Sequence, residues 1–186
     1  MRYHDIGRRD GAMILFGGPY SNVQALVALK EAAKARGIAA DHMVCTGDVV
    51  ASAADARDCC AQLQALDCPV IAGNCEVQLG SGADNCGCGF EEGTPCDLLS
   101  AGWFAHASAE ITDADRVWMQ SLPRFATFVH QGARYGVLHG GVTDIARFIW
   151  STSEDAVFAE EWAALAAITG PVENIIAGHS GVPIIR

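Results

Sequence analysis

Four polar residues in this chain of 186 residues each follow a short apolar run and lie beside a glycine. They are Asp48 in Thr-Gly-Asp, Asn74 in Gly-Asn-Cys, His139 in Leu-His-Gly-Gly and His179 in Gly-His-Ser. Open α/β sheets place their ligands at the carboxyl ends of strands. A carboxylate, an amide oxygen and two imidazoles together suit a borderline divalent metal ion. The sequence therefore predicts an α/β fold with a metal site at the ends of its strands.

Short apolar runs alternate with helical segments along the first part of the chain. Strands are expected at residues 13–16, 43–46 and 69–72, with helices at 23–35 and 53–66 between them. This order implies a parallel sheet with right-handed crossovers. In the second half, helices are expected over 97–109, over 153–169 and from the capping box at Thr112 to Pro123. A hairpin of strands 125–130 and 134–138 and a last strand at 174–177 are also expected.

Length and the lack of internal repeats favour a single domain over residues 1–186. Residues 76–95 are rich in glycine and also contain asparagine, aspartate and cysteine, which predicts a long loop. Loops of this length are uncommon unless they are functional. Segment 76–123 is therefore expected to be a loop and helical insertion over the site.

The formal net charge of −10 argues against nucleic acid or an anionic membrane as the partner. The polar and charged N-terminus does not have the pattern of a signal peptide. No apolar run reaches the roughly 18 residues that a membrane-spanning helix needs. We therefore expect a soluble, cytoplasmic protein.

The strand-end residues resemble the motifs of the calcineurin-like metallophosphoesterases. That family has Gly-Asp after its second strand, Gly-Asn-His after its third, a later His often followed by Gly-Gly, and a terminal Gly-His-x-His. This chain matches them in order with Gly47-Asp48, Gly73-Asn74, His139-Gly140-Gly141 and Gly178-His179. The resemblance covers nearly the whole chain and implies a layered α/β fold with a mainly parallel central sheet flanked by helices. Because members usually continue with further strands, a segment beyond Arg186 is also expected.

The ligands that this family uses only for its first metal ion are absent from the sequence. Gly18-Pro19-Tyr20 stands in place of the Asp-x-His that follows the first strand, and Gly181 stands in place of the last histidine. The resemblance implies that the four strand-end residues form the complete ligand set of the second metal ion. We therefore expect one divalent ion (Mn, Fe or Zn) and no second one.

The residue after Asn74 also departs from the family. The family motif has a histidine there that assists proton transfer near the leaving group, whereas this chain has Cys75 followed by Glu76. A thiol is a poorer general acid at neutral pH than an imidazole, but its thiolate is a good soft ligand and nucleophile. Cys75 and Glu76 are therefore the candidate catalytic residues, and Cys75 could instead bind the same metal ion or pair with another cysteine.

Eight cysteines are a high count, and in a cytosolic chain they favour metal binding or catalysis over disulfides. Cys86, Cys88 and Cys96 lie in or next to the predicted loop. They could form a soft-metal site, with Cys75 or Cys45 as a fourth ligand. The equal alternative is a loop held by a disulfide or by packed, reduced thiols, because the paired spacing of strong zinc motifs is missing.

The resemblance implies a metal-dependent hydrolase of phosphomonoesters or phosphodiesters that acts on a small phosphorylated substrate or binds a phosphate-like ligand. Asn22 and Arg147 are the candidates for contacting this ligand, and Arg147 could do so as a bidentate donor. With one metal ion the clamp on the phosphoryl group is reduced, so weak or specialised activity is expected. The alternative is a catalytically degenerate relative that binds a ligand or partner, with a cysteine loop that responds to redox conditions.

Overall fold

The strands of the computed structural model, which describes residues 3–186, form two hydrogen-bonded sheets. The smaller sheet pairs β2 (Ile14–Phe16) with β3 (Met43–Cys45) in parallel. The larger sheet has the order β1-β4-β5-β6 and consists of β1 (Tyr3–Arg8), β4 (Phe125–His130), β5 (Ala133–Leu138) and β6 (Asn174–Ala177). Only the β4–β5 hairpin is antiparallel among these pairings, so the mainly parallel arrangement is confirmed.

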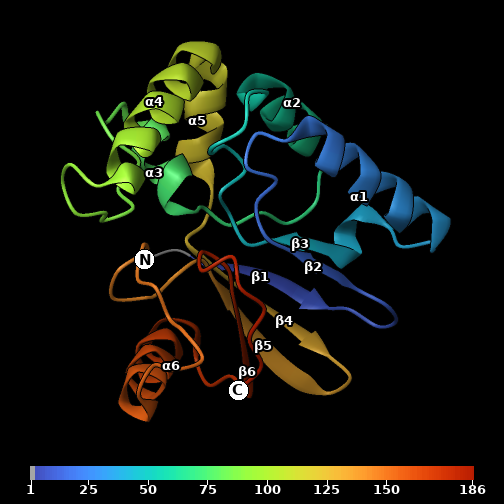
Figure 1. The fold of residues 1–186 in the computed structure, drawn as a ribbon. Helices are drawn as coiled ribbons and strands as arrows, with labels where there is room; N and C mark the ends of the chain where they lie inside the picture. The colour runs from blue at the N-terminus through green and yellow to red at the C-terminus, as the bar shows by residue number, and fades with distance from the viewer. Residues whose placement is uncertain (1–2) are drawn as a thin grey trace.

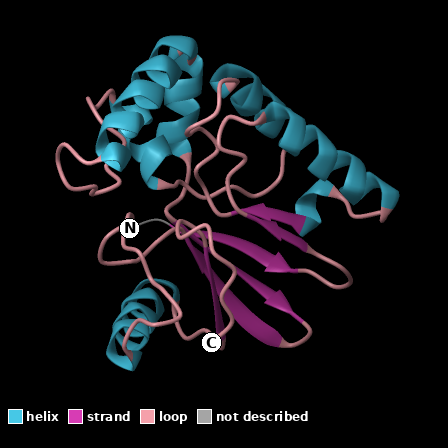
Figure 2. Ribbon diagram, in the orientation of Figure 1, coloured by secondary structure: helices cyan, strands magenta, loops and turns pink. Residues whose placement is uncertain are grey.

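Helices cover the strands from two sides (Figures 1 and 2). The helical segments are α1 (Val23–Ala35), η1 (Ala40–His42), α2 (Ala56–Leu66), α3 (Asn74–Ser81), α4 (Pro95–Glu110), α5 (Asp113–Ser121) and α6 (Asp155–Thr169). Figure 1 shows α1 to α5 on one side of the strands and α6 on the other. None of the helices within residues 3–186 combines the length and apolar character needed to cross a bilayer.

The three-residue strand β3 shows how the layers are held together. Met43 and Cys45 pack into the core cluster beneath α1 to α5, whereas Val44 packs with Ile6 and Phe128 of the larger sheet. Because side chains alternate between the two faces of a strand, β3 contributes to a core on each side and is buried throughout. A third core cluster, which includes Leu165, joins α6 to the larger sheet.

Most of the predicted elements are confirmed, with ends that shift by up to three residues. Helix α1, the β4–β5 hairpin and strand β6 occur where the sequence predicts them. The strand expected at 69–72 is reduced to one isolated bridge between Cys45 and Val70, so this prediction was wrong in extent. Its last residue leaves the sheet, because the Ala72 amide donates to the carbonyl oxygen of Pro123.

Two further predictions need correction. The segment expected as a loop over 76–95 begins as helix α3, and the Glu76 carboxylate accepts a hydrogen bond from the Gly73 amide at its N-terminus. The edge strand β1 was not predicted, because Ile6 is the only apolar side chain that this strand buries. Both elements depend on tertiary contacts more than on local apolar periodicity.

Candidate metal centre

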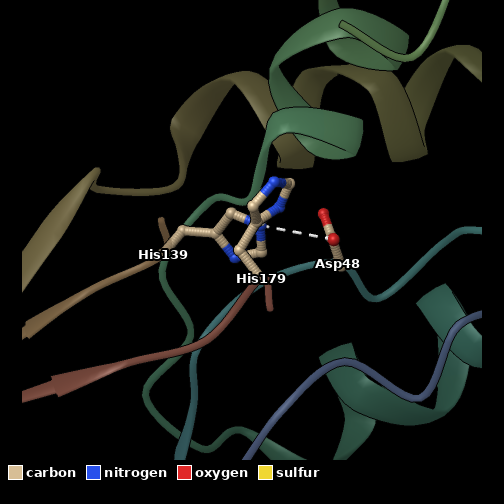
Figure 3. A group of neighbouring side chains, drawn as sticks. All are labelled: Asp48, His139 and His179. Carbon is tan, nitrogen blue, oxygen red and sulfur yellow. Dashed lines mark hydrogen bonds and ion pairs between the residues drawn. The ribbon is translucent and has the colours of Figure 1, made fainter. Parts of the chain in front are cut away.

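Residues that follow strands of both sheets, and the first residue of one helix, bring their side chains together at the strand ends. Asp48 follows β3, His139 directly follows β5, His179 follows β6, and Asn74 is the first residue of α3. We call these four residues the strand-end cluster. Figure 3 shows Asp48, His139 and His179 directed toward one another.

The Nε2 atom of His139 is the centre of the strand-end cluster. It lies 3.3 Å from Asp48 Oδ2, 3.1 Å from Asn74 Oδ1 and 3.1 Å from His179 Nδ1. One ligand atom from each of Asp48, His139 and His179 lies within 4.8 Å of the others. The structure therefore brings together all four residues that the sequence predicts as metal ligands.

Two hydrogen bonds fix which atoms face the centre. His139 Nδ1 lies 2.6 Å from the Thr46 carbonyl oxygen, which only accepts, so Nδ1 carries the hydrogen and Nε2 of the neutral ring presents a lone pair. The Asn74 Nδ2 atom donates to the Cys86 carbonyl oxygen at 2.8 Å, which directs Oδ1 inward. Three lone pairs then face one point: those of the neutral His139 ring, the Asn74 amide oxygen and the Asp48 carboxylate. Because lone pairs repel one another, such a group requires a cation between them, either a proton or a metal ion.

The pKa directions follow from this geometry. Burial opposes charge on His139, but the hydrogen bond and charge of Asp48 outweigh it and raise the pKa of this imidazole. Burial also opposes ionisation of Asp48, yet its contacts with His139 lower the pKa of the carboxyl. Burial and the neighbouring His139 lower the pKa of His179, which favours the neutral form that metal ions bind.

Two members of this group have strained backbone conformations. Asp48 and His179 are non-glycine residues in the left-handed region, with φ of 54° and 61°. Such conformations persist only where the surrounding structure enforces them, and they tend to occur at functional sites. A Cβ atom at Gly73 would overlap Asp48 Oδ1, so only glycine allows this close packing of the loops.

Glu76 braces the backbone behind the strand-end cluster. Its fully buried carboxylate accepts hydrogen bonds from the amides of Asp48 (2.8 Å), Val50 (3.2 Å) and Gly73 (2.9 Å). Burial and the charge of Asp48 raise the pKa of Glu76 to about 7. These contacts are those of a positioning residue, and the catalytic role expected for Glu76 stays a prediction.

Three cysteines lie next to Asn74, and we call Cys75, Cys86 and Cys88 the thiol cluster. The Cys86 thiol donates to Cys88 Sγ at 2.7 Å, and Asn74 Nδ2 lies 3.3 Å from the same sulfur. Hydrogen bonds from the Cys75 and Cys86 thiols lower the pKa of Cys88 to about 4, although burial opposes this. Cys75, which the sequence singles out as a nucleophile, is buried and its pKa is raised, first by its hydrogen bond to Cys88.

The cysteine-metal site expected from Cys86, Cys88 and Cys96 is not assembled. Cys96 is exposed in the first turn of α4, and Cys75 instead completes the thiol cluster. Within residues 3–186, the strand-end cluster supplies the one set of three His, Cys, Asp or Glu ligand atoms that are mutually within 4.8 Å.

Both residues expected to contact phosphate have hydrogen-bond partners within the protein, and their role toward phosphate stays a prediction. Asn22 caps α1, and its Oδ1 accepts from the Ala25 amide at 2.9 Å. Arg147 Nη1 lies 2.8 Å from a Glu160 oxygen and 2.6 Å from a Glu161 oxygen. Each side chain thus already has partners elsewhere in the fold.

A cavity of about 290 Å³ opens beside the two histidines. Its wall includes Phe16, Gly18, Tyr20, His139 and His179, and among residues 3–186 no lysine or arginine lines it. Burial and then the charge of Asp48 raise the pKa of Tyr20 to about 12, so its phenol stays protonated at neutral pH.

Solved structures share this arrangement of strands and helices. A metallophosphoesterase from Sphaerobacter thermophilus aligns over 93% of this chain and 62% of its own length, with 18% identity and a TM-score of 0.62. The hypothetical protein PH1004 from Pyrococcus horikoshii OT3 aligns over 92% of this chain and 70% of its own, with 14% identity and a TM-score of 0.69. The chain has the metallophosphoesterase fold. No protein-family model and no curated protein sequence matches it.

The chain spans less than two thirds of the Sphaerobacter metallophosphoesterase. At two positions where the metallophosphoesterase resemblance implies first-metal ligands, this chain has Tyr20 and Gly181. The Tyr20 phenol is close enough to Asp48, Cys75 and Cys88 for their charges to raise its pKa. An aromatic side chain thus lies near Asp48 at a sequence position where the resemblance implies a metal ligand.

The groups that orient the strand-end cluster in this metallophosphoesterase fold were not predicted from the sequence. The carbonyl oxygens of Thr46 and Cys86 orient His139 and Asn74, but backbone groups leave no signal in residue type. The capping position of Glu76, three residues after Gly73, is the one local signal that could have indicated a positioning role.

Proposed function

We propose that this chain is a metal-dependent phosphoester hydrolase with one divalent ion, Mn, Fe or Zn, bound by the strand-end cluster. The convergence of Asp48, Asn74 and His179 on His139 Nε2 supports this proposal most directly. Two imidazole nitrogens, one carboxylate and one amide oxygen match the preferences of these ions. The residues present therefore fit a single ion.

The protein contributes a preorganised set of ligands. Thr46 fixes the tautomer of His139 and Cys86 fixes the orientation of the Asn74 amide. When bound, a divalent ion supplies Lewis-acid activation of a phosphoryl oxygen and of an attacking water. The protonated phenol of Tyr20 borders the same cavity and can donate a hydrogen bond to a phosphoryl oxygen.

The cavity also limits the size and charge of the substrate. Its volume of about 290 Å³ suits a small phosphomonoester or phosphodiester better than a macromolecule. Because no lysine or arginine in the described part of the chain lines it and the net charge is −10, phosphate attraction depends on the bound ion. We therefore expect weak affinity and slow turnover.

Hydrolysis of p-nitrophenyl phosphate and bis(p-nitrophenyl) phosphate tests this function. Mn²⁺-loaded protein should hydrolyse at least one of them slowly, and removal of the ion by a chelator should abolish turnover. Tyr20→Phe should raise KM several-fold, because it removes a donor at the cavity wall. Turnover that survives the chelator would contradict the proposal. Stoichiometric metal binding without turnover of either compound would favour a non-catalytic binding relative.

A further inference from the structure

The thiol cluster has a geometry that the proposed hydrolase does not use. Cys88 Sγ accepts from the Cys86 thiol at 2.7 Å and lies 3.3 Å from Asn74 Nδ2. The sulfur atoms of Cys86 and Cys88 are thus in direct contact. Cys88 is only partly buried, whereas Cys75 and Cys86 are fully buried, so Cys88 is the member that a small solute can reach.

Cys86 is placed to react with a modified Cys88. The two sulfur atoms are 2.7 Å apart, and only Gly87, with φ of 65°, separates the residues in the chain. Glycine adopts this left-handed conformation without cost, which lets the two side chains turn to the same side. Two thiols in contact, one of them partly exposed, are the arrangement of a reversible dithiol.

Asn74 connects the thiol cluster to the strand-end cluster. Its Oδ1 lies 3.1 Å from His139 Nε2, while its Nδ2 lies 3.3 Å from Cys88 Sγ and 2.8 Å from the Cys86 carbonyl oxygen. The amide is buried and rigid, so a change at its nitrogen side is transmitted to its oxygen. Groups that orient metal ligands typically affect metal affinity by about 10- to 100-fold.

We propose that Cys86 and Cys88 form a peroxide-reactive dithiol whose oxidation weakens metal binding through Asn74. The Cys88 sulfur attacks hydrogen peroxide, forming an S–O bond as the O–O bond breaks, and the Cys88 proton leaves with the hydroxide as water. The Cys86 sulfur then attacks Cys88 Sγ, so that an S–S bond forms, the S–O bond breaks and water leaves with the Cys86 proton. Two electrons pass from the two sulfurs to the peroxide.

Oxidation changes the contacts that hold the Asn74 amide. The Cys88 sulfur moves when the disulfide closes, so its 3.3 Å contact with Asn74 Nδ2 is lost. Closing the disulfide also moves the Cys86 carbonyl oxygen, which accepts from that nitrogen at 2.8 Å, and leaves Cys75 Sγ, at 3.6 Å, as the remaining neighbour. Asn74 Oδ1 is then no longer fixed toward the centre, and this consequence rests on the proposed metal site.

The test uses the full chain, reduced and free of metal. After treatment with hydrogen peroxide, peptide mapping by mass spectrometry should locate one disulfide, between Cys86 and Cys88, that a dithiol reductant reverses. Calorimetry should show Mn²⁺ affinity about tenfold or more lower in the oxidised protein and restored on reduction. Cys96→Ser, which alters an exposed cysteine outside the thiol cluster, should respond like the wild type, whereas the affinity of Cys88→Ser should not respond to peroxide.

The outcomes separate this inference from the proposed function. A reduced protein that binds Mn²⁺ but forms no Cys86–Cys88 disulfide would overturn the dithiol and leave the metal site intact. A disulfide that forms without any change in affinity would overturn the coupling through Asn74. A reduced protein that binds no Mn²⁺ would overturn the metal site and, with it, the coupling.

Discussion

Replacing His139 with alanine is expected to lower Mn²⁺ affinity by at least about 100-fold and to abolish metal-dependent phosphoester hydrolysis. The other three members of the strand-end cluster all face His139 Nε2, so this substitution removes the atom on which the site is centred. Even residues that only orient a ligand contribute about 10- to 100-fold to metal affinity. Calorimetric titration with Mn²⁺, followed by the p-nitrophenyl phosphate assay, measures both effects.

A matched control is His4→Ala, because His4 is exposed on the edge strand β1. This variant should bind Mn²⁺ as the wild type does. Circular dichroism should show that His139→Ala keeps its secondary structure, which separates loss of the ligand from loss of the fold. Wild-type affinity in a folded His139→Ala protein would contradict the assigned site.

Replacing Glu76 with alanine is expected to lower the free energy of unfolding by at least about 3 kcal/mol, because each buried group left without a partner costs about 1–3 kcal/mol. Three amides, those of Asp48, Val50 and Gly73, lose their acceptor in this variant. All three lie in the loops that carry the strand-end cluster. Urea unfolding followed by circular dichroism gives the free energy directly.

Two further variants serve as controls for this measurement. Glu92→Ala, at an exposed position in the loop before α4, should change stability by less than about 0.5 kcal/mol. Glu76→Gln should fall between the alanine variant and the wild type, because it keeps one acceptor oxygen while its amide group faces a backbone donor. A Glu76→Ala protein as stable as the Glu92→Ala control would show that Glu76 is not a brace.

The strand-end residues were predictable because their signal is local. An apolar run, a glycine and a polar donor occupy neighbouring positions in the sequence, and parallel strands bring their carboxyl ends to one edge. His139 and His179 follow the adjacent parallel strands β5 and β6, so any correct pairing of these strands brings them together. The division of the strands into two sheets was not predicted, because short strands do not encode their partners.

The supports of the site were not predictable because they depend on contacts between distant segments. Arg147 was expected to contact phosphate, yet Glu160 and Glu161, on the following helix, engage its guanidinium. The thiol cluster contains Cys75 and not Cys96. Cys75 follows Asn74 in α3, and the loop after α3 folds back so that the Cys86 carbonyl oxygen contacts Asn74. Residue types and spacing alone do not reveal these pairings.

Elemental analysis of Mn²⁺-loaded and desalted protein, compared with its His139→Ala, His179→Ala double variant, tests the central claim most directly. The wild type should retain about one equivalent of the ion and the double variant almost none, because the variant lacks both imidazole ligands. Metal retained in the double variant, or two equivalents in the wild type, would contradict a single ion bound by the strand-end cluster.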